Sequence, residues 1–141
     1  MNPWLKVPYE DYERHMSDED VCQLQTLNLI FKTHVKNLKP KSVLVLGCTG
    51  GNGFEHINDE ITEIVVGVDI NKDYLDRCRK LYSNKNYILD LRCMDISTED
   101  ILIQNIDFIS CALLLEYVDN QALLSKIKKV MDKSSKLNIV I

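Results

Sequence analysis

The feature that most constrains the fold is an apolar run that ends in a glycine-rich turn. Residues 42–47 read SVLVLG, and residues 48–53 continue as CTGGNG. A continuous apolar run is typical of a strand that is buried on both faces, as in a parallel sheet. Glycines directly after such a strand let the backbone approach a ligand closely. The stretch is therefore typical of a nucleotide-binding strand and turn, and it leaves open whether the nucleotide carries a pyrophosphate.

The rest of the chain alternates between strand patterns and helix patterns. Further strands are predicted over residues 63–69, 86–94, 106–114 and 136–141. Helices are predicted over residues 51–59 and 97–104, and also after Asn71 and Asp119, whose side chains can cap a helix. Strands that alternate with helices form right-handed βαβ units around a parallel sheet. The predicted fold class is α/β, with a three-layer, doubly wound and mainly parallel sheet over residues 40–141.

Two segments precede this alternation. Residues 1–16 show no hydrophobic period and carry three aromatic side chains and a histidine. Ser17 is a suitable N-cap, and the three acids that follow it suit the first turn of a helix. Apolar residues then recur at spacings of three and four until Pro40. We expect an irregular aromatic segment over 1–16, a helix over 17–39 and a single domain overall.

Charge and hydropathy argue against several kinds of partner. The net charge is −4, with 45% hydrophobic and 27% charged residues in a chain of 141. Proteins that bind nucleic acid backbones are usually basic, so no nucleic acid partner is expected. No apolar run approaches the roughly 20 residues of a membrane span, so no membrane partner is expected. Acids stand near the N-terminus where a signal peptide would be apolar, and we expect a cytoplasmic protein.

The five cysteines are widely spaced, at Cys22, Cys48, Cys78, Cys93 and Cys111. They form no C-x-x-C pair and no Cys/His cluster, so no metal site is predicted. We interpret most of them as small buried hydrophobes in a reducing compartment. Cys48 lies in the glycine turn, but no histidine or aspartate is spaced to activate it, so we do not expect a nucleophile there.

The glycine turn and one acid define a candidate nucleotide site. Asp69 ends the second predicted strand, about 20 residues after the glycines, which is the spacing of an acid that contacts a ribose hydroxyl. The pattern G-x-G-x-x-G fails because Thr49 stands at its second glycine. The pattern G-x-x-G-x-x-G fits at Gly47, Gly50 and Gly53, and it resembles the short-chain dehydrogenase family and its NAD(P)-binding relatives. The Tyr-x-x-x-Lys pair of that family is absent from the chain.

A second resemblance covers more of the chain, roughly residues 40–141. The segments VLVLGCTGGNG, VVGVDIN, CMDIS and IDFISCALLLEYVD resemble, in order and spacing, the motifs of class I S-adenosylmethionine-dependent methyltransferases. The resemblance implies a Rossmann-like core that binds S-adenosylmethionine and releases S-adenosylhomocysteine. It implies cofactor contacts by Gly47, Cys48, Thr49 and Gly51 at the methionine half, by Asp69 at the ribose, by Ile70, Met94 and Asp95 at the adenine, and by Ala112 and Leu113 beside the cofactor.

The same resemblance implies where a methyl acceptor would bind. In this family an aromatic segment ahead of the core often folds over the site, so residues 1–16, with Tyr9, Tyr12 and His15, are interpreted as a lid. Glu116 and Tyr117 are expected near the mouth of the site. Together with His15 they are candidate bases, and no catalytic residue is assigned. The segments that mark methylation of exocyclic base amines or of cytosine C5 are absent, which favours a small-molecule or protein acceptor.

Two positions depart from the family pattern. Val45 stands where an acid usually precedes the first glycine, and Thr49 stands where the middle glycine is usual. These departures leave a third hypothesis open, a non-catalytic S-adenosylmethionine-binding module. The sequence stops inside the apolar strand 136–141, and a bare apolar edge favours association. We expect a fragment truncated after the fifth strand, whose exposed edge is also a candidate dimer contact.

Overall fold

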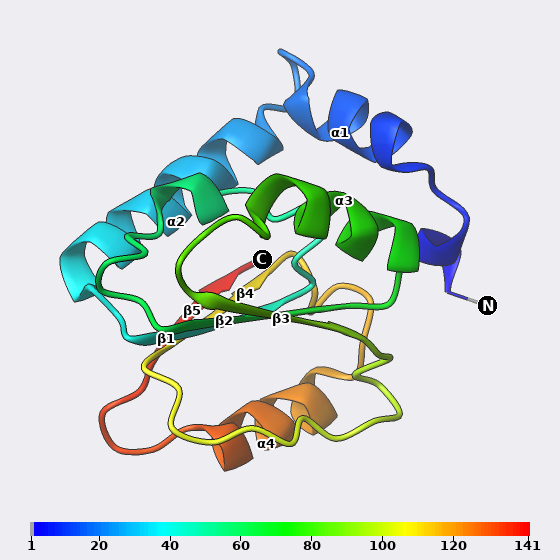
Figure 1. Cartoon of the computed structure of the whole chain (residues 1–141). Coiled ribbons are helices and arrows are strands. Elements are labelled where there is room, and N and C mark those ends of the chain that lie inside the picture. The colour runs from blue at the N-terminus through cyan, green and yellow to red at the C-terminus, as the bar shows by residue number, and fades with distance from the viewer. Residues whose placement is uncertain (1) are drawn as a thin grey trace.

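The computed structural model describes residues 2–141, and it contains one five-stranded sheet in the order β3-β2-β1-β4-β5 (Figure 1). Every neighbouring pair of strands is parallel. The five strands are β1 (Ser42–Leu46), β2 (Ile64–Asp69), β3 (Ile88–Cys93), β4 (Phe108–Ala112) and β5 (Lys136–Val140). The predicted α/β class and parallel sheet are confirmed.

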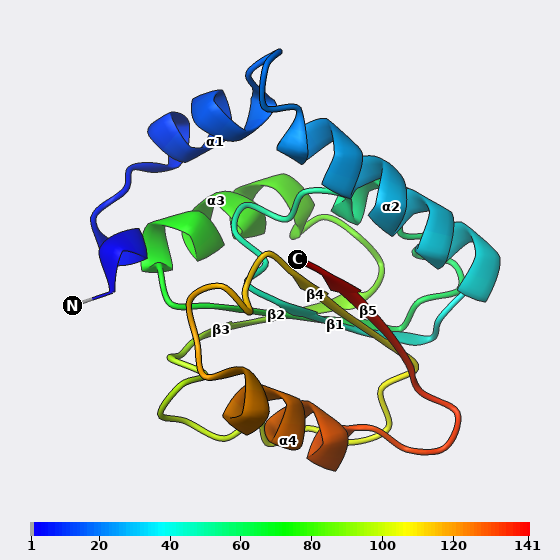
Figure 2. The same ribbon diagram turned by 180° about the vertical axis from the view of Figure 1, so that it is seen from behind.

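Helices cover both faces of the sheet. One face carries α2 (Gln23–Leu38) and α3 (Lys72–Tyr82), with α1 (Tyr9–Ser17) on the same side, and the other face carries α4 (Asn120–Val130) (Figures 1 and 2). Because successive strand residues point to opposite faces, the three central strands β1, β2 and β4 contribute to two cores. The α4 side buries Leu44, Leu46, Val66, Val68, Ile109, Cys111, Leu123 and Ile127, and the other side buries Phe31, Val35, Val43, Val65, Leu75, Cys78 and Phe108.

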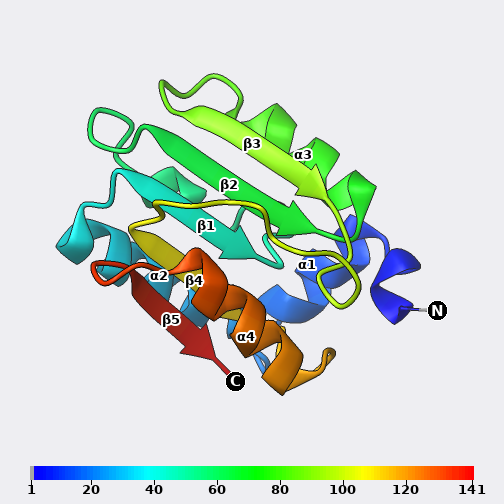
Figure 3. The ribbon, with the colours of Figure 1, turned by 90° about the horizontal axis from the view of Figure 1, so that it is seen from below.

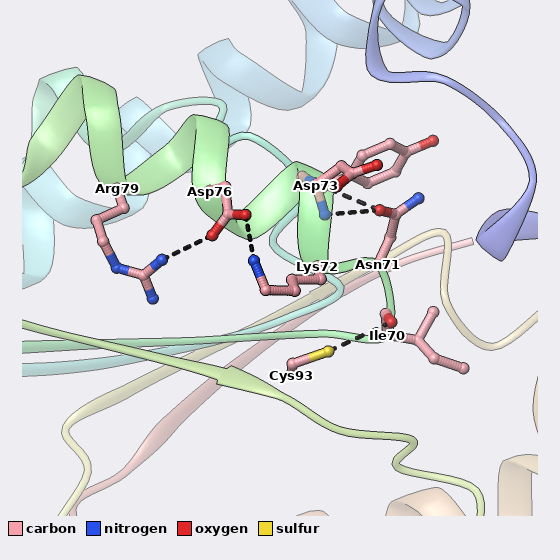
Figure 4. A network of polar contacts seen from close by, with 8 residues as sticks. Ile70, Asn71, Lys72, Asp73, Asp76, Arg79 and Cys93 are labelled. Atoms are coloured by element: carbon pink, nitrogen blue, oxygen red, sulfur yellow. Dashed lines mark hydrogen bonds and ion pairs between the residues drawn. The ribbon is translucent and has the colours of Figure 1, made fainter.

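The two caps that were predicted from single residues are present. The Asn71 side chain accepts hydrogen bonds from the backbone N–H groups of Asp73 and Tyr74 at the start of α3 (Figure 4). Asp119 accepts from the N–H of Ala122 at 2.7 Å at the start of α4. Both bonds satisfy helix N–H groups that have no partner within the helix. Along the exposed side of α3, Asp76 pairs with Lys72 and Arg79 (Figure 4).

The N-terminal region differs from the expectation. Residues Pro3–Leu5 form a 3₁₀ turn, η1, and Tyr9–Ser17 form α1, so the segment is largely helical; Met1 lies outside the described residues. Ser17 ends α1 and does not cap the next helix, which begins only at Gln23. The Asp18 side chain accepts from the N–H of Asp20 at 2.9 Å and forms a turn there. Such local bonds compete with helix formation, and they explain why the acidic run separates two helices.

Two other predicted helices are not formed as expected. In place of a helix over 51–59, the chain forms only the 3₁₀ turn η2 (Phe54–His56). Gly53 has φ +93°, and a Cβ at this position would lie 2.7 Å from the Phe31 ring, so the backbone passes directly beneath α2. The helix predicted over 97–104 is absent: the Asp95 side chain closes a turn with Ser97, and the next residues run irregularly to β4. The predicted strands exceed the observed ones by one or two residues at their ends.

No helix among residues 2–141 is both long enough and apolar enough to cross a membrane.

Candidate functional site

A cavity of about 390 Å³ opens at the carboxyl ends of β1, β2 and β4. Strand β1 lies between β2 and β4, and the chain leaves β1 toward β2 but returns on its other side as β4 (Figure 3). In open α/β sheets this reversal of strand order leaves a crevice that binds ligands. The volume lies within the range of small-molecule sites. The sequence motifs quoted above therefore meet at one cavity.

The turn after β1 is fixed by hydrogen bonds to the neighbouring strand. The N–H groups of Gly47 and Cys48 both donate to the carbonyl of Val68, at 2.8 and 3.0 Å. Thr49 follows with φ +48°, a left-handed conformation that is unusual for a β-branched residue. Its N–H donates to Oδ2 of Asp69 at 2.9 Å. Thr49 thus follows a backbone path that glycine adopts without strain, and this path aims its N–H at the acid.

Asp69 ends β2 and is held at both carboxylate oxygens. Oδ2 accepts from Thr49, and Oδ1 accepts from the N–H of Asn71 at 2.9 Å. The side chain is buried and lines the cavity. Burial raises the pKa of Asp69, although the backbone N–H donors act in the opposite direction. The group is therefore oriented before any ligand arrives, and a ligand with hydroxyl donors would compensate part of its desolvation.

The end of the cavity beyond β2 and β3 is lined by Ile70, Met94, Asp95 and Ile96. Oδ1 of Asp95 accepts from the Ser97 N–H at 2.9 Å and from the Ser97 hydroxyl. These bonds lower the pKa of Asp95. Asp95 therefore both closes a turn and presents an ionised carboxyl group at an otherwise apolar end of the cavity.

The loop after β4 forms another wall. Ala112, Leu113, Glu116 and Tyr117 line the cavity, as does Leu114. Leu113 has φ +55°, and its N–H donates to the carbonyl of Val140 at 2.8 Å. Like Thr49, it is a non-glycine residue in a left-handed conformation at the cavity. Such residues cluster at functional sites, where the surrounding structure holds the strain.

The N-terminal segment lies over the cavity. Trp4, Tyr12, His15 and Met16 contribute to its lining. The Tyr12 ring lies 5.5 Å from Tyr74 and 6.1 Å from Trp4 by centroid distance. Two hydrogen bonds dock this segment on α3: Asn71 Nδ2 donates to the Trp4 carbonyl at 2.9 Å, and the Tyr74 hydroxyl donates to the Val7 carbonyl at 2.8 Å.

Two of the predicted site residues do not line the cavity. Gly51 has φ +83°, and a Cβ there would lie 2.8 Å from Cys78 Sγ, so this glycine faces α3. The Tyr9 ring covers Gly50, where a Cβ would lie 2.5 Å from the Tyr9 hydroxyl. Gly51 thus packs the glycine turn against α3, and Tyr9 packs on the turn at Gly50, so both stabilise the turn without lining the cavity. The cavity brings together all the other predicted residues. These are Gly47, Cys48, Thr49, Asp69, Ile70, Met94, Asp95, Ala112, Leu113, Tyr12, His15, Glu116 and Tyr117.

Sequence reasoning missed a further group of lining residues. They include Gln23, Leu27, Ile30 and Phe31 of α2, Tyr74 of α3, and Ser110, Asn138 and Val140 of the last two strands. Apart from Gln23, the α2 residues read as one apolar helix face, which carries no sign of a ligand. Ser110 and Asn138 carried a usable signal, because each interrupts an otherwise apolar strand with a polar side chain.

The cavity lining carries mainly acidic side chains. Its ionisable side chains include three carboxyl groups, on Asp69, Asp95 and Glu116, and the imidazole of His15. Among the described residues that line it there is neither lysine nor arginine. Cys48 also lines the cavity, but burial raises the pKa of its thiol well above the usual value, which opposes nucleophilic chemistry. No group of three or more His, Cys, Asp and Glu residues within 2–141 is arranged to hold a metal ion.

Residues 44–139 match a family model described as a methyltransferase domain. The chain belongs to this family. The match includes residues of all five strands and the cavity residues from Val45 to Asn138, and it confirms the resemblance seen in the sequence. A search among curated protein sequences gives no significant match.

Solved structures of methyltransferases share the fold. An S-adenosylmethionine-dependent methyltransferase from Clostridium acetobutylicum is 18% identical with a TM-score of 0.68, and the match covers 92% of this chain and 54% of that one. The plantazolicin methyltransferase BpumL, solved with S-adenosylhomocysteine, is 20% identical with a TM-score of 0.65, over 90% of this chain and 55% of that one. A phosphoethanolamine N-methyltransferase from Haemonchus contortus, solved with phosphoethanolamine and S-adenosylhomocysteine, is 12% identical with a TM-score of 0.67, over 93% and 31%. The chain thus spans about half the length of the first two proteins and about a third of the length of the third.

Proposed function

We propose that this chain is the cofactor-binding core of an S-adenosylmethionine-dependent methyltransferase that acts on a small molecule. The observation that carries this proposal is the charge of the cavity. Three carboxyl groups and no lysine or arginine favour a ligand with net positive charge and no phosphate. S-adenosylmethionine fits, because it carries a sulfonium and an ammonium group against one carboxylate. Membership of the methyltransferase domain family supports the same cofactor.

A dinucleotide fits the cavity less well. Rossmann proteins place the pyrophosphate of NAD(P) at the N-terminus of the helix that follows the glycine turn. Here the glycine turn leads only into η2, a single 3₁₀ turn of three residues. No cationic side chain among the described lining residues replaces that helix. The dehydrogenase-like alternative therefore lacks the groups that would neutralise its phosphates.

The proposed roles of the residues follow the geometry of the cavity. We place the methionine half against the backbone of Gly47, Cys48 and Thr49. Asp69 would accept hydrogen bonds from the ribose hydroxyls. We place the adenine between Ile70 and Met94, with Asp95 as acceptor for its amino group, and we place Ala112 and Leu113 beside the sulfonium. These assignments are supported by the common lining of one cavity.

When bound, the cofactor would supply an electrophilic methyl group to a lone pair of the acceptor, with S-adenosylhomocysteine as the leaving group, and the acceptor would give up a proton. The chain has to align the acceptor and exclude water. We propose that the segment before α2 acts as the lid, since Trp4 and Tyr12 lie over the cavity. His15 and Glu116 are candidates to receive the proton, His15 on an imidazole nitrogen and Glu116 on a carboxylate oxygen. Tyr117 is the third candidate, and it would receive the proton on a phenolate oxygen.

A non-catalytic binding module is the second candidate, and Val45 is the observation in its favour. Val45 lines the cavity where an acid is usual in the family, so one contact to the methionine ammonium group is missing. Thr49, which replaces the family's middle glycine, does not favour a non-catalytic module. It keeps the left-handed backbone that directs its N–H to Asp69. We also propose a cytoplasmic location, which the five free cysteines support.

The proposal is tested by calorimetric titration of the full chain with S-adenosylhomocysteine, NADH and NADPH. We expect micromolar binding of S-adenosylhomocysteine and none of either nicotinamide nucleotide. Asp69→Asn should weaken that binding at least tenfold, whereas Asp100→Asn, at an exposed aspartate away from the cavity, should leave it unchanged. Binding of NADH or NADPH in place of S-adenosylhomocysteine would overturn the proposal. Binding of S-adenosylhomocysteine without methyl transfer to any acceptor would favour the non-catalytic module.

A further inference from the structure

The cavity extends away from Asp69 into a recess between α2 and the last two strands. We call the part lined by Leu27 and Ile30 of α2 and by Val45, Ser110, Asn138 and Val140 of the sheet the α2–β5 recess. Helix α2 contacts β4 and lies on the face of the sheet opposite α4 (Figures 2 and 3). None of the residues proposed to hold the cofactor belongs to this recess. Val45 borders the place proposed for the methionine ammonium group, and the rest of the recess is space that a second substrate can occupy.

The floor of the α2–β5 recess is a row of paired residues on three strands. In the parallel register Val45 pairs with Ser110, and Ser110 pairs with Asn138. Paired residues of neighbouring strands point to the same face, so the three side chains lie side by side. Two polar groups therefore stand next to each other at the bottom of an otherwise apolar recess.

Both polar side chains of this floor lack a hydrogen-bond partner within the described residues. Ser110 is only 5% exposed, and its neighbours in β4 are apolar. Neither its hydroxyl nor the Asn138 amide takes part in any of the side-chain hydrogen bonds of residues 2–141, yet both residues line the cavity. Asn138 is half-buried, and among the described residues Tyr87 Oη, not either of these groups, is the fully buried polar atom without a partner. Both groups are therefore open to the cavity, where their donors and acceptors are available to a ligand. The Asn138 amide offers both donors and an acceptor, and the Ser110 hydroxyl offers one donor and acceptor sites.

Charge narrows the kind of molecule that fits. The named residues of the α2–β5 recess carry no charge, and the acidic and basic side chains elsewhere among the described lining residues are three carboxyl groups and His15, beside tyrosines and Cys48. A carboxylate or phosphate placed there would lose its hydration without gaining a cation, and it would face carboxylates of like charge. A neutral hydroxyl or a neutral amine meets neither penalty, and a protonated amine, although it also loses hydration, is attracted by the carboxylates instead of repelled.

We infer that the methyl acceptor is a small amphipathic amine or alcohol without negative charge. It binds in the α2–β5 recess, with its apolar body against Leu27, Ile30 and Val140 and its polar group hydrogen-bonded to Ser110 and Asn138. This inference rests on the proposed methyltransferase function and deepens it, since it names the acceptor class and two specificity-determining residues. Pockets of this kind, apolar with a few polar groups that fix orientation, are usual for small ligands.

The test compares three probes that share one apolar body and differ in charge. The full chain, saturated with S-adenosylhomocysteine, is titrated with 2-phenylethylamine, 2-phenylethanol and 3-phenylpropanoate, and binding is followed by ligand-observed NMR without any turnover. We expect the amine and the alcohol to bind at least tenfold more tightly than the carboxylate. Equal or tighter binding of the carboxylate, or no binding by any of the three, overturns the inference.

Variants then locate the probes. Ser110→Ala and Asn138→Leu should each weaken the amine and the alcohol three- to tenfold and leave the affinity for S-adenosylhomocysteine within twofold. Ser125→Ala, an exposed serine on α4, is the matched control. Asn138→Lys, at a half-buried edge position, should reverse the preference toward the carboxylate, and it remains informative if Ser110→Ala does not fold. Unchanged probe binding in the Asn138 variants overturns the inference, whereas loss of S-adenosylhomocysteine binding by the unaltered chain is a failure of the proposed function itself.

Discussion

The indole ring of Trp4 and the phenol ring of Tyr117 meet edge to face, with centroids 5.1 Å apart and planes at 90°. One ring belongs to the N-terminal segment and the other to the loop after β4, and both line the cavity. The pair therefore joins two segments of the cavity lining that are distant in the sequence. Because the two residues lie far apart in the sequence, the contact exists only when the whole core is folded.

This contact predicts an energetic coupling between the two aromatic residues. Edge-to-face pairs contribute about 0.5–1.5 kcal/mol beyond the burial of their area. A double-mutant cycle of Trp4→Ala and Tyr117→Ala, measured as free energy of unfolding in urea, should give a coupling energy in that range. The cycle of Trp4→Ala with Leu124→Ala, at an exposed leucine of α4, should be additive. Additivity in both cycles would show that the rings do not interact in solution.

The raised pKa of Asp69 predicts how cofactor affinity depends on pH. Burial is the main cause of the shift, so the carboxyl group takes up a proton at a higher pH than an ordinary aspartate. As the pH falls through this raised pKa, S-adenosylhomocysteine affinity should fall, while Asp95, whose pKa is lowered, stays ionised. In Asp69→Asn the affinity should be weaker at all pH values and lack this acidic decline. Titration calorimetry over a pH series checks both curves.

The same shift has the opposite consequence for stability. Because the folded pKa of Asp69 lies above the unfolded one, ionisation favours the unfolded chain. The contribution of this group to the free energy of unfolding is fully present below the unfolded pKa, and it is lost as the pH rises through the folded pKa. A bound ligand that donates hydrogen bonds to the carboxylate should recover part of that loss.

The left-handed backbone of Thr49 predicts that a glycine stabilises this position. A β-branched residue at φ +48° costs about 1–3 kcal/mol, and glycine in place of it loses about 0.5–1 kcal/mol of backbone entropy. Thr49→Gly should therefore raise the free energy of unfolding by about 1 kcal/mol, seen as a Tm about 2–4 °C higher. Thr49→Ala removes the same side-chain atoms but keeps a Cβ, so it should gain less. Equal Tm values for the two variants would contradict the strain argument.

Substitution of Asn71 should cause two separable losses, because this residue caps α3 and also holds the N-terminal segment through the Trp4 carbonyl. Asn71→Ala removes both bonds and should cost about 1–2 kcal/mol of the free energy of unfolding. Asn71→Asp keeps the cap but has no N–H for the Trp4 carbonyl, so it should cost about half as much. Both variants should speed hydrogen exchange over Trp4–Ser17. If Asn71→Asp exchanges there as slowly as the unaltered chain, the Asn71–Trp4 bond does not dock the segment.

Features with a local cause were predictable from sequence. The strands were found because parallel strands buried on both faces are continuous apolar runs, and Asn71 and Asp119 were found because a cap needs only a side chain and the next two or three N–H groups. Asp69 and the glycine turn were found by their spacing. Each of these patterns lies within a few residues of the chain or at a fixed offset along it.

Features that depend on distant packing were not predictable in this way. The run after Gly53 reads as a helix until it is known that Phe31 of α2 already occupies that side of the sheet. Ser17 reads as a cap unless the Asp18 turn is recognised. Ser110 and Asn138 become one site only through the register of β4 and β5, which no single-strand pattern contains.

The replacement of a crossover helix by α2 also has a consequence for the order of folding. The ring of Phe31 packs on Phe54, which follows soon after it, and on Phe108, which belongs to β4. Helix α2 precedes every strand in the sequence, yet its apolar face is fully packed only after β4 has joined the sheet. Such non-local closure slows folding. We therefore expect the amides of α2 to become protected from hydrogen exchange late in refolding, together with those of β4. The helix that lines one side of the cavity thus comes before every strand in the sequence but packs in its final place only with β4.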